Sequence, residues 1–369
     1  MGSSIAIRAS GLAYENPRPP SGNVQVQHPS LVSLDGDELL ATFDLDRQYL
    51  PMDYRTVVAR SSDLGETWTV ERPVLDSPPP STTHSIRTSR LSDGSLMGLG
   101  LMNRLEDPQT PVVNRETFGR QPGDLFLVRS ADSGRSWTGP DRIETPLVGP
   151  SWEICHHVVE LADGRLLAPT ATWRGWDGEN PSGEQSPVFI SDDGGRTWPT
   201  FGRSFDGRAA GLTHWEQSVV QLQDRRILAV SWVYDIQTGR TYPNEYAVSE
   251  DRGATFSPPM QTGLHAQTCK VLQLRDGRVL AVYRRHDRPG LWATTASLEG
   301  EVWTNLEHLP LWEGAESGMS GRGAGIDELR GLKFGYPSFV QLPSGEVLVV
   351  FWCEEDGATH IRWTRLALD

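Results

Sequence analysis

Reactive side chains gather at one recurring place in this sequence. Six of the nine histidines lie close to the start of short apolar segments, and Glu216, Tyr336, Arg87 and Lys270 lie at similar places. Those histidines are His28, His84, His156, His157, His214 and His265. Imidazole, carboxylate and phenol groups can move protons or attack a substrate, and a guanidinium group binds carboxylates. A set of side chains with a purely structural role would not need to be so rich in reactive groups, so the cluster indicates a binding or catalytic site. The alternative is that these side chains line a water-filled central channel.

The apolar segments belong to an internal repeat. A leucine, a turn containing Asp, Ser or Gly, and an apolar strand recur from Leu34, Leu91, Leu161, Leu222, Leu274 and Leu342. An apolar or alternating stretch precedes each copy, so each copy is predicted to be two strands around a tight turn. Aligning the copies places six residues at one equivalent inner-strand position: His28, Ser85, Cys155, Glu216, Thr268 and Tyr336. Six hairpins predict six blades.

A second motif occurs four times, about one repeat period apart. Its copies are SSDLGETW, SADSGRSW, SDDGGRTW and SEDRGATF, which begin at residues 61, 130, 191 and 249. The pattern is typical of a turn in which Asp accepts bonds from nearby backbone N–H groups, Gly adopts a positive φ, and the aromatic side chain fills the gap to the next strand. These residues are therefore assigned a structural role.

This turn is the Asp box, and with the sixfold hairpin repeat it makes the chain resemble the sialidase superfamily over nearly its whole length. The resemblance implies an all-β fold, a six-bladed β-propeller of four-stranded antiparallel blades, and a single domain over residues 1–369. Because a closed ring leaves no exposed sheet edge, we expect the strand at residues 5–14 to complete the last blade beside the C-terminal strand. The tight turns and Asp boxes then share one face, and the long loops and the starts of the inner strands share the other, where ligand-binding loops are expected.

The resemblance also implies catalytic residues. Tyr336 in FGYPSFVQ resembles the sialidase nucleophile, and Glu216 in HWEQSVVQ resembles the glutamate that activates it. A phenol attacks poorly at neutral pH unless a neighbouring carboxylate takes its proton, and a neutral nucleophile avoids repulsion with an acidic sugar. Asp53 is the candidate acid/base, with Asp44 and Asp46 as rivals.

The chain departs from the family in the arginines that bind the sugar carboxylate. Gln27 and His28 stand where the first arginine is expected, and Trp232 stands where the second is expected. A third could be Arg284, Arg285 or Arg288, and Arg87, Arg322 or Arg330 could substitute from elsewhere. The substrate-binding candidates are His28, Arg87, His156, His157, Trp215, His265, Gln267, Arg285 and Glu354. The sequence thus predicts a glycoside hydrolase that cleaves a terminal sugar, sialic-acid-like, uronic or other.

Three alternatives remain open at this point. Sialidase-like folds include polysaccharide lyases that use His and Tyr on a uronate, which suits the histidine-rich rim. Exo-arabinanases lack the arginine triad and use two glutamates, for which Glu153 and Glu216 are candidates. A non-catalytic propeller that binds glycan or protein is the third alternative, because fold does not determine function.

Composition narrows the possible partners. The chain has 37 Gly, 26 Pro and 13 Trp in 369 residues, which suits many short strands and turns. A formal net charge of −14 without a basic stretch argues against nucleic acid as a partner. The three cysteines are far apart, with no metal-binding spacing, and no cofactor or metal is predicted. No segment is apolar enough for a membrane span or a signal peptide, so we expect no membrane partner, a cytoplasmic location, and a glycan or oligosaccharide as substrate.

Overall fold

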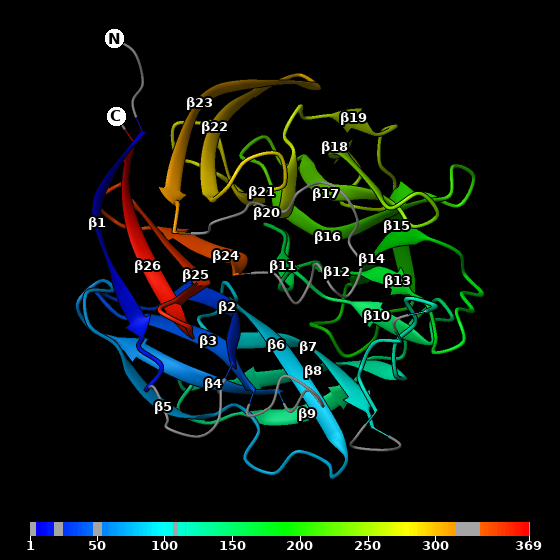
Figure 1. Cartoon of the computed structure of the whole chain (residues 1–369), viewed down its shortest axis with the longest axis horizontal. Helices are drawn as coiled ribbons and strands as arrows, with labels where there is room; N and C mark the ends of the chain where they lie inside the picture. The colour runs from blue at the N-terminus through cyan, green and yellow to red at the C-terminus, as the bar shows by residue number, and fades with distance from the viewer. Residues whose placement is uncertain are drawn as a thin grey trace.

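Residues 5–17, 25–46, 54–105, 110–114, 116–314 and 333–368 are described by the computed structural model, and their regular secondary structure is entirely β-strand. The strands form six antiparallel blades around a common axis, so the predicted six-bladed propeller is confirmed (Figure 1). Within these ranges no helix is long and apolar enough to cross a membrane.

Each blade runs outward from an inner strand at the axis. Blade 1 contains β2 (Gln25–Ser33), β3 (Leu39–Asp46), β4 (Tyr54–Ser61) and β5 (Thr69–Pro73). Blade 2 contains β6 (Thr82–Arg90), β7 (Leu96–Arg104), β8 (Gly123–Ser130) and β9 (Thr138–Arg142). Blade 3 contains β11 (Val159–Glu160), β12 (Leu166–Pro169), β14 (Gln185–Ser191) and β15 (Thr200–Asp206), and β10 (Ser151–Glu153) pairs with β13 (Ala171–Trp173) beside them.

The other three blades keep the same order. Blade 4 contains β16 (Leu212–Gln221), β17 (Ile227–Asp235), β18 (Arg240–Ser249) and β19 (Met260–Gln261). Blade 5 contains β20 (Ala266–Gln273), β21 (Val279–Arg285), β22 (Leu291–Glu299) and β23 (Val302–Trp312). Blade 6 contains β24 (Phe334–Gln341), β25 (Val347–Glu355), β26 (Ala358–Leu368) and, as its outer strand, β1 (Ile5–Tyr14). The first and last strands of the chain, β1 and β26, therefore pair within one blade, as Figure 1 shows.

The six predicted hairpin turns are present. In each, the leucine N–H donates to the carbonyl of the residue four positions later, for example Leu34 to Glu38 at 2.9 Å and Leu342 to Glu346 at 2.8 Å. The same bond forms from Leu91, Leu161, Leu222 and Leu274. This repeated closure aligns the strands that follow, so equivalent positions of the inner strands lie at equivalent heights along the axis.

The four Asp boxes fold as the sequence predicts. In the first box the Asp63 carboxylate accepts the N–H groups of Glu66 and Thr67 at 3.1 and 2.9 Å, and the Ser61 hydroxyl accepts the Gly65 N–H at 2.8 Å. Corresponding bonds surround Asp132, Asp193 and Asp251. Each carboxylate thus replaces backbone partners that the turn leaves unpaired.

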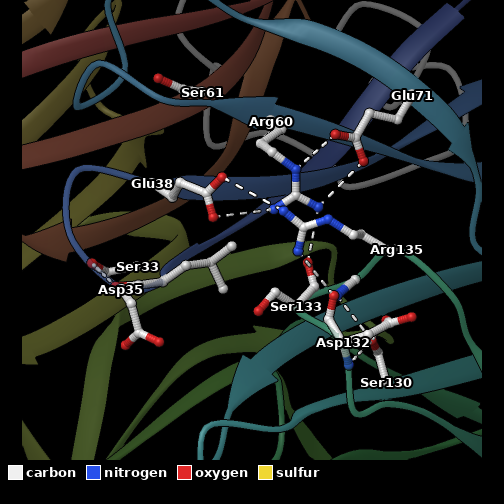
Figure 2. A network of polar contacts seen from close by, with 12 residues as sticks. Ser33, Asp35, Glu38, Arg60, Ser61, Glu71, Ser130, Asp132, Ser133 and Arg135 are labelled. Carbon is white, nitrogen blue, oxygen red and sulfur yellow. Dashed lines mark hydrogen bonds and ion pairs between the residues drawn. The ribbon is translucent and has the colours of Figure 1, made fainter.

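The Asp boxes also join neighbouring blades. Arg60 of β4 donates to the carbonyl of Ser133, in the box of blade 2, at 2.8 Å, and it bonds Glu71 at 2.6 Å (Figure 2). A Cβ on Gly134 would lie 2.4 Å from Leu40 Cδ1 of blade 1, so this position needs glycine for close approach as well as for its φ of +81°. Between blades, apolar faces pack against each other, as Leu40 and Val58 of blade 1 do in one cluster with residues of blade 2.

Candidate functional site

A cavity of about 210 Å³ lies at the end of the ring where the inner strands begin. All six blades contribute to its wall, which includes His28, Arg87, Glu153, Glu216, Arg284 and Tyr336. The closed ring therefore brings together side chains that are more than 300 residues apart in sequence, because each inner strand points its first residues at the axis.

Four of the six aligned inner-strand residues have a positive φ: His28 at 54°, Glu216 at 58°, Thr268 at 49° and Tyr336 at 48°. At each of them the pairing of the inner strand with the next strand shifts register, as at a β-bulge. A non-glycine residue in this region costs about 1–3 kcal/mol, and such strain concentrates at functional sites. The bulges re-aim these residues, which is why four different residue types share one conformation.

Two buried carboxylates lie side by side in the cavity. The backbone N–H of Glu216 donates to Glu153 Oε2 at 3.2 Å, and the Glu216 carboxylate accepts the backbone N–H of Thr268. Burial raises the pKa of the Glu216 carboxyl; the charge of Arg284 opposes the rise and that of Glu153 adds to it. Glu153 Oε1 has no hydrogen-bond partner among the described residues. The Glu216 carboxyl therefore keeps a proton more readily than an ordinary glutamate.

Tyr336 lies between these carboxylates and a cationic side chain. Burial raises the pKa of the Tyr336 phenol well above its usual value, and the neighbouring Cys155, Glu216 and Glu153 raise it further. The Arg87 guanidinium lies 5.6 Å from the centre of the Tyr336 ring. Burial and these neighbours therefore hold the phenol in its neutral form.

A histidine–aspartate pair adjoins Tyr336. His28 Nδ1 lies 3.0 Å from Asp44 Oδ2, and the His28 ring meets the Tyr336 ring edge-on at 4.3 Å. Burial lowers the pKa of His28 more than its bond to Asp44 raises it, so the imidazole is neutral at pH 7. Asp44 is fully buried and also accepts the hydroxyls of Thr56, at 2.6 Å, and Ser85. Asp44 thus orients His28 and has no access to a leaving group.

Three arginines line the same cavity. Arg284 is almost fully buried; its Nε and Nη2 donate to Gln267 Oε1 at 3.2 and 3.0 Å, and its Nη1 donates to the Phe334 carbonyl at 2.8 Å. Arg120 donates to the Trp152 carbonyl at 3.2 Å, and its Nε has no partner among the described residues. The third is Arg87. A guanidinium has five N–H donors, so each of these groups retains donors for an anionic ligand.

Aromatic side chains form one side of the cavity. Trp173 and Trp215 stack at 4.4 Å with an interplanar angle of 11°, and Arg120 lies 4.9 Å over the Trp173 ring. Trp232, 5.7 Å from Trp215, has a buried indole N–H without a partner in the described part of the chain, and the same holds for Trp215. Flat aromatic faces beside free N–H donors are suited to a sugar ring and its hydroxyls.

Comparison with known proteins identifies the family. The model of a BNR repeat-like domain matches residues 110–349, which is more than half of the chain. The chain belongs to the BNR repeat-like domain family. No curated protein sequence matches significantly.

Solved structures of other proteins share this fold. A protein of unknown function from Dyadobacter fermentans superposes with a TM-score of 0.76 at 20% identity, covering 99% of each chain. The Hadza microbial sialidase Hz136 superposes with a TM-score of 0.66 at 19% identity, over 92% of this chain and 65% of that one. An α-L-arabinanase from Penicillium chrysogenum, complexed with arabinobiose, superposes with a TM-score of 0.67 at 15% identity, over 98% of both. The expected likeness to sialidases thus holds for the fold.

Within this BNR repeat-like ring, six of the predicted site residues line the cavity: His28, Arg87, Trp215, Glu216, Gln267 and Tyr336. Gln27 and Trp232, at the positions where the resemblance leads one to expect arginines, also line it. Glu153, considered as one of two catalytic glutamates, is present as well. Asp53, Arg322 and Arg330 lie outside the described residues.

The structure places the other predicted residues elsewhere. Arg285 bonds Asp287 at 2.7 Å and stacks on Trp292, because successive residues of a strand face opposite ways and its neighbour Arg284 takes the cavity side. His265 packs against His286 at 5.2 Å, and Glu354 pairs with Lys333. His156 and His157 line a second cavity, further along the axis.

Arg120 is the residue that sequence reasoning missed. It comes from the long connection between β7 and β8, on the face where the sequence predicts ligand-binding loops but singles out no residue of this connection. The described residues contain no group of three or more His, Cys, Asp and Glu side chains placed to hold a metal ion.

Proposed function

We propose that this protein is a glycoside hydrolase that removes a terminal, acidic sugar from a glycan. The observation that carries the proposal is the meeting of Tyr336, two buried glutamates and three arginines in one cavity. The chain as a whole is strongly acidic, with a formal charge of −14, so three arginines in one small cavity are a local feature. Paired guanidinium donors are the usual means of holding a carboxylate.

In the proposed reaction Tyr336 attacks the anomeric carbon while Glu216 accepts the phenol proton. The Tyr336 Oη–carbon bond forms as the glycosidic carbon–oxygen bond breaks, and the leaving oxygen takes a proton from an acid that we assign to Asp53. Water then attacks the anomeric carbon and gives a proton back to Asp53, its oxygen–carbon bond forms as the tyrosyl–sugar bond breaks, and the phenol proton returns from Glu216. Arg284 and Arg120 hold the sugar's anionic group, and the raised pKa of Glu216 suits a group that must both accept and return a proton.

The bond from the Glu216 backbone N–H to the Glu153 carboxylate brings the two residues together in the cavity, which supports a second division of labour within the same function. In that version Glu153 is the nucleophile and Glu216 is the acid/base, as expected for two-carboxylate glycosidases. Tyr336 would then orient the sugar without forming a bond to it. The two versions differ in what the loss of the Tyr336 hydroxyl does.

The His28–Asp44 pair favours a second candidate function, elimination on a uronate. A neutral imidazole beside a phenol can remove the proton next to the carboxyl group, while the phenol protonates the leaving oxygen. This reaction leaves a carbon–carbon double bond in the product, whereas hydrolysis adds water.

One panel of substrates and variants tests these proposals. The wild-type protein is screened on sialosides, uronates and arabinosides, with products followed by chromatography and by ultraviolet absorbance. Glu216→Gln should lower turnover about 10²–10⁴-fold, the usual contribution of a general acid or base. Glu144→Gln, a change at a carboxylate that is 87% exposed, is the matched control and should leave turnover unchanged.

The remaining variants assign the roles. If Tyr336 is the nucleophile, Tyr336→Phe abolishes turnover and Glu153→Gln leaves part of it; the reverse pattern assigns the nucleophile to Glu153. Absorbance from a new double bond, lost in His28→Gln, would identify a lyase. Absence of any product from all three substrate classes, or full turnover in both Glu216→Gln and Tyr336→Phe, would overturn the proposed enzyme.

A further inference from the structure

A second cavity lies on the propeller axis and opens toward the hairpin turns. Its volume is about 820 Å³, and the inner strands of all six blades line it. These strands surround the centre of the ring in Figure 1. Arg87 and Tyr336 form part of both cavities, so the axial cavity begins directly behind the candidate active site.

Lysine is rare in this chain, and one of its two copies lies in the axial cavity. The sequence contains only Lys270 and Lys333. Lys333 is half exposed and pairs with Glu354. Lys270 is 8% exposed, and its Nζ has no hydrogen-bond partner among the described residues. An ammonium group that is buried without a partner is costly, so it requires water or a ligand to offset the lost hydration.

The surroundings of Lys270 in this cavity are cationic or neutral. Arg87 reaches the cavity; its Nη1 lies 3.7 Å from Asp44 Oδ2, and its buried Nε has no hydrogen-bond partner in the described part of the chain. His156 and His157 stack at 4.1 Å; burial and the charge of Lys270 lower the pKa of His157 to about 4, so this imidazole is neutral at pH 7 and has an N–H to donate. The positive charges are thus concentrated in the interior of the cavity.

Negative charge near the cavity is already in use. Among the described residues that line it, Glu160 is the one carboxylate, and it accepts the N–H and the hydroxyl of Ser92, the latter at 2.9 Å, beside a hairpin turn. Glu216, which lines the first cavity, is close enough for the charge of Lys270 to lower its pKa, but it forms no ion pair with Lys270. The ammonium therefore faces a space without a counter-ion from the described chain.

We propose that the axial cavity is a binding site for a small oxyanion of the phosphate or sulfate class, with Lys270 as its principal ligand. Charge-assisted N–H···O⁻ bonds from Lys270 and Arg87, with a neutral donor from His157, match the several acceptor oxygens of such an anion. The site differs from the one that holds the sugar's anionic group, because Arg120 and Arg284 line only the first cavity and Arg87 alone of the three arginines reaches both. It gives His157 and Lys270 a role that the proposed hydrolysis leaves unassigned.

Calorimetric titration of the full chain with inorganic phosphate, in Tris-chloride buffer, tests the proposal. The wild type should bind one phosphate saturably, sulfate should compete, and Lys270→Met should weaken binding at least about tenfold, the effect of losing one charge-assisted bond. Lys333→Met removes the other lysine and should bind phosphate as the wild type does. Arg120→Met should also bind normally, which separates this site from the first cavity.

A thermal melt with and without phosphate provides a second readout, because a ligand that binds only the folded state raises its melting temperature. The wild type and Lys333→Met should shift to higher temperature, and Lys270→Met should not. If Lys270→Met does not fold, Lys270→Gln replaces it in both measurements. Absence of saturable heat and of any melting shift in the wild type, or equal affinity in the Lys270 variants, would overturn the proposal.

Discussion

Gly335, at the start of the sixth inner strand, should control the position of Arg284. Its φ of +153° disfavours other residues, and a Cβ there would lie 2.3 Å from Arg284 Nη1. Arg284 has little room to move, because it is 2% exposed and two of its bonds go to Gln267. Gly335→Ala should therefore break the 2.8 Å bond from Arg284 Nη1 to the Phe334 carbonyl and displace the guanidinium from the cavity wall.

The expected cost has two parts. Loss of a hydrogen bond from a charged donor costs about 1.5–3 kcal/mol. The positive φ adds about 1–2 kcal/mol for a residue with a Cβ. Gly335→Ala should thus lower the free energy of unfolding by about 2.5–5 kcal/mol, a large share of the stability of a typical domain.

Gly345→Ala, in the hairpin turn of the same blade, is the matched control. Gly345 also has a positive φ, +95°, but nothing lies within 4 Å of the Cβ that alanine would add. It should cost only the backbone part, about 1–2 kcal/mol. Denaturant unfolding of the three proteins measures the difference, and turnover of an acidic glycoside reports the displacement of Arg284. Equal destabilisation by the two alanines, with turnover unchanged, would refute the reasoning.

Three further predictions concern the box turns, the thiols and the aromatic wall. Burial raises the pKa of Asp63, but hydrogen bonds from Thr67 and its neighbours outweigh burial and lower that pKa to about 2. The stabilising effect of the Asp63 carboxylate is therefore complete above pH 4 and disappears as the pH falls toward 2. The denaturant midpoints of wild type and Asp63→Asn should converge over that range. Burial raises the pKa of the Cys155 thiol well above its usual value, and it raises the pKa of Cys269 and Cys353 to about 12. A thiol reagent at pH 8 should therefore label the native protein far more slowly than the denatured one. Trp173→Ala removes the faces on which Arg120 and Trp215 stack, so KM for the substrate should rise about tenfold while Trp173→Phe keeps most of the affinity; equal KM values for the two variants would contradict this role.

The sequence predicted which positions of the inner strands are equivalent better than it predicted which residues contact one another there. The alignment of six hairpins identified His28, Glu216, Thr268 and Tyr336 as equivalent, and the structure gives all four the same positive φ. It did not predict that a fully buried Asp44 would orient His28, because that contact joins two strands through a side chain whose burial no local pattern reports. Asp44 therefore supports the site through its bond to His28 and does not itself line the cavity.

The origin of the guanidinium groups in the cavity was the hardest part to predict. The sequence showed that Gln27 and Trp232 replace two expected arginines, and the structure places both in the cavity wall. Arg120 supplies a guanidinium from a different connection, where it lies over Trp173. Such a replacement depends on the path of a long loop, and loop paths follow from packing rather than from sequence spacing.

The number of blades, the hairpin turns and the Asp boxes are readable from the amino-acid sequence, because these depend on periodicity and on bonds between residues only a few positions apart. Which side chains share a cavity depends on the folded ring. Arg284 and Arg285 are neighbours in sequence but face opposite sides of one strand, and His156 and His157 line the axial cavity behind the one that holds Glu153. The direction in which each side chain points and its depth along the axis are fixed when the ring closes, because each blade is then held in place by its neighbours.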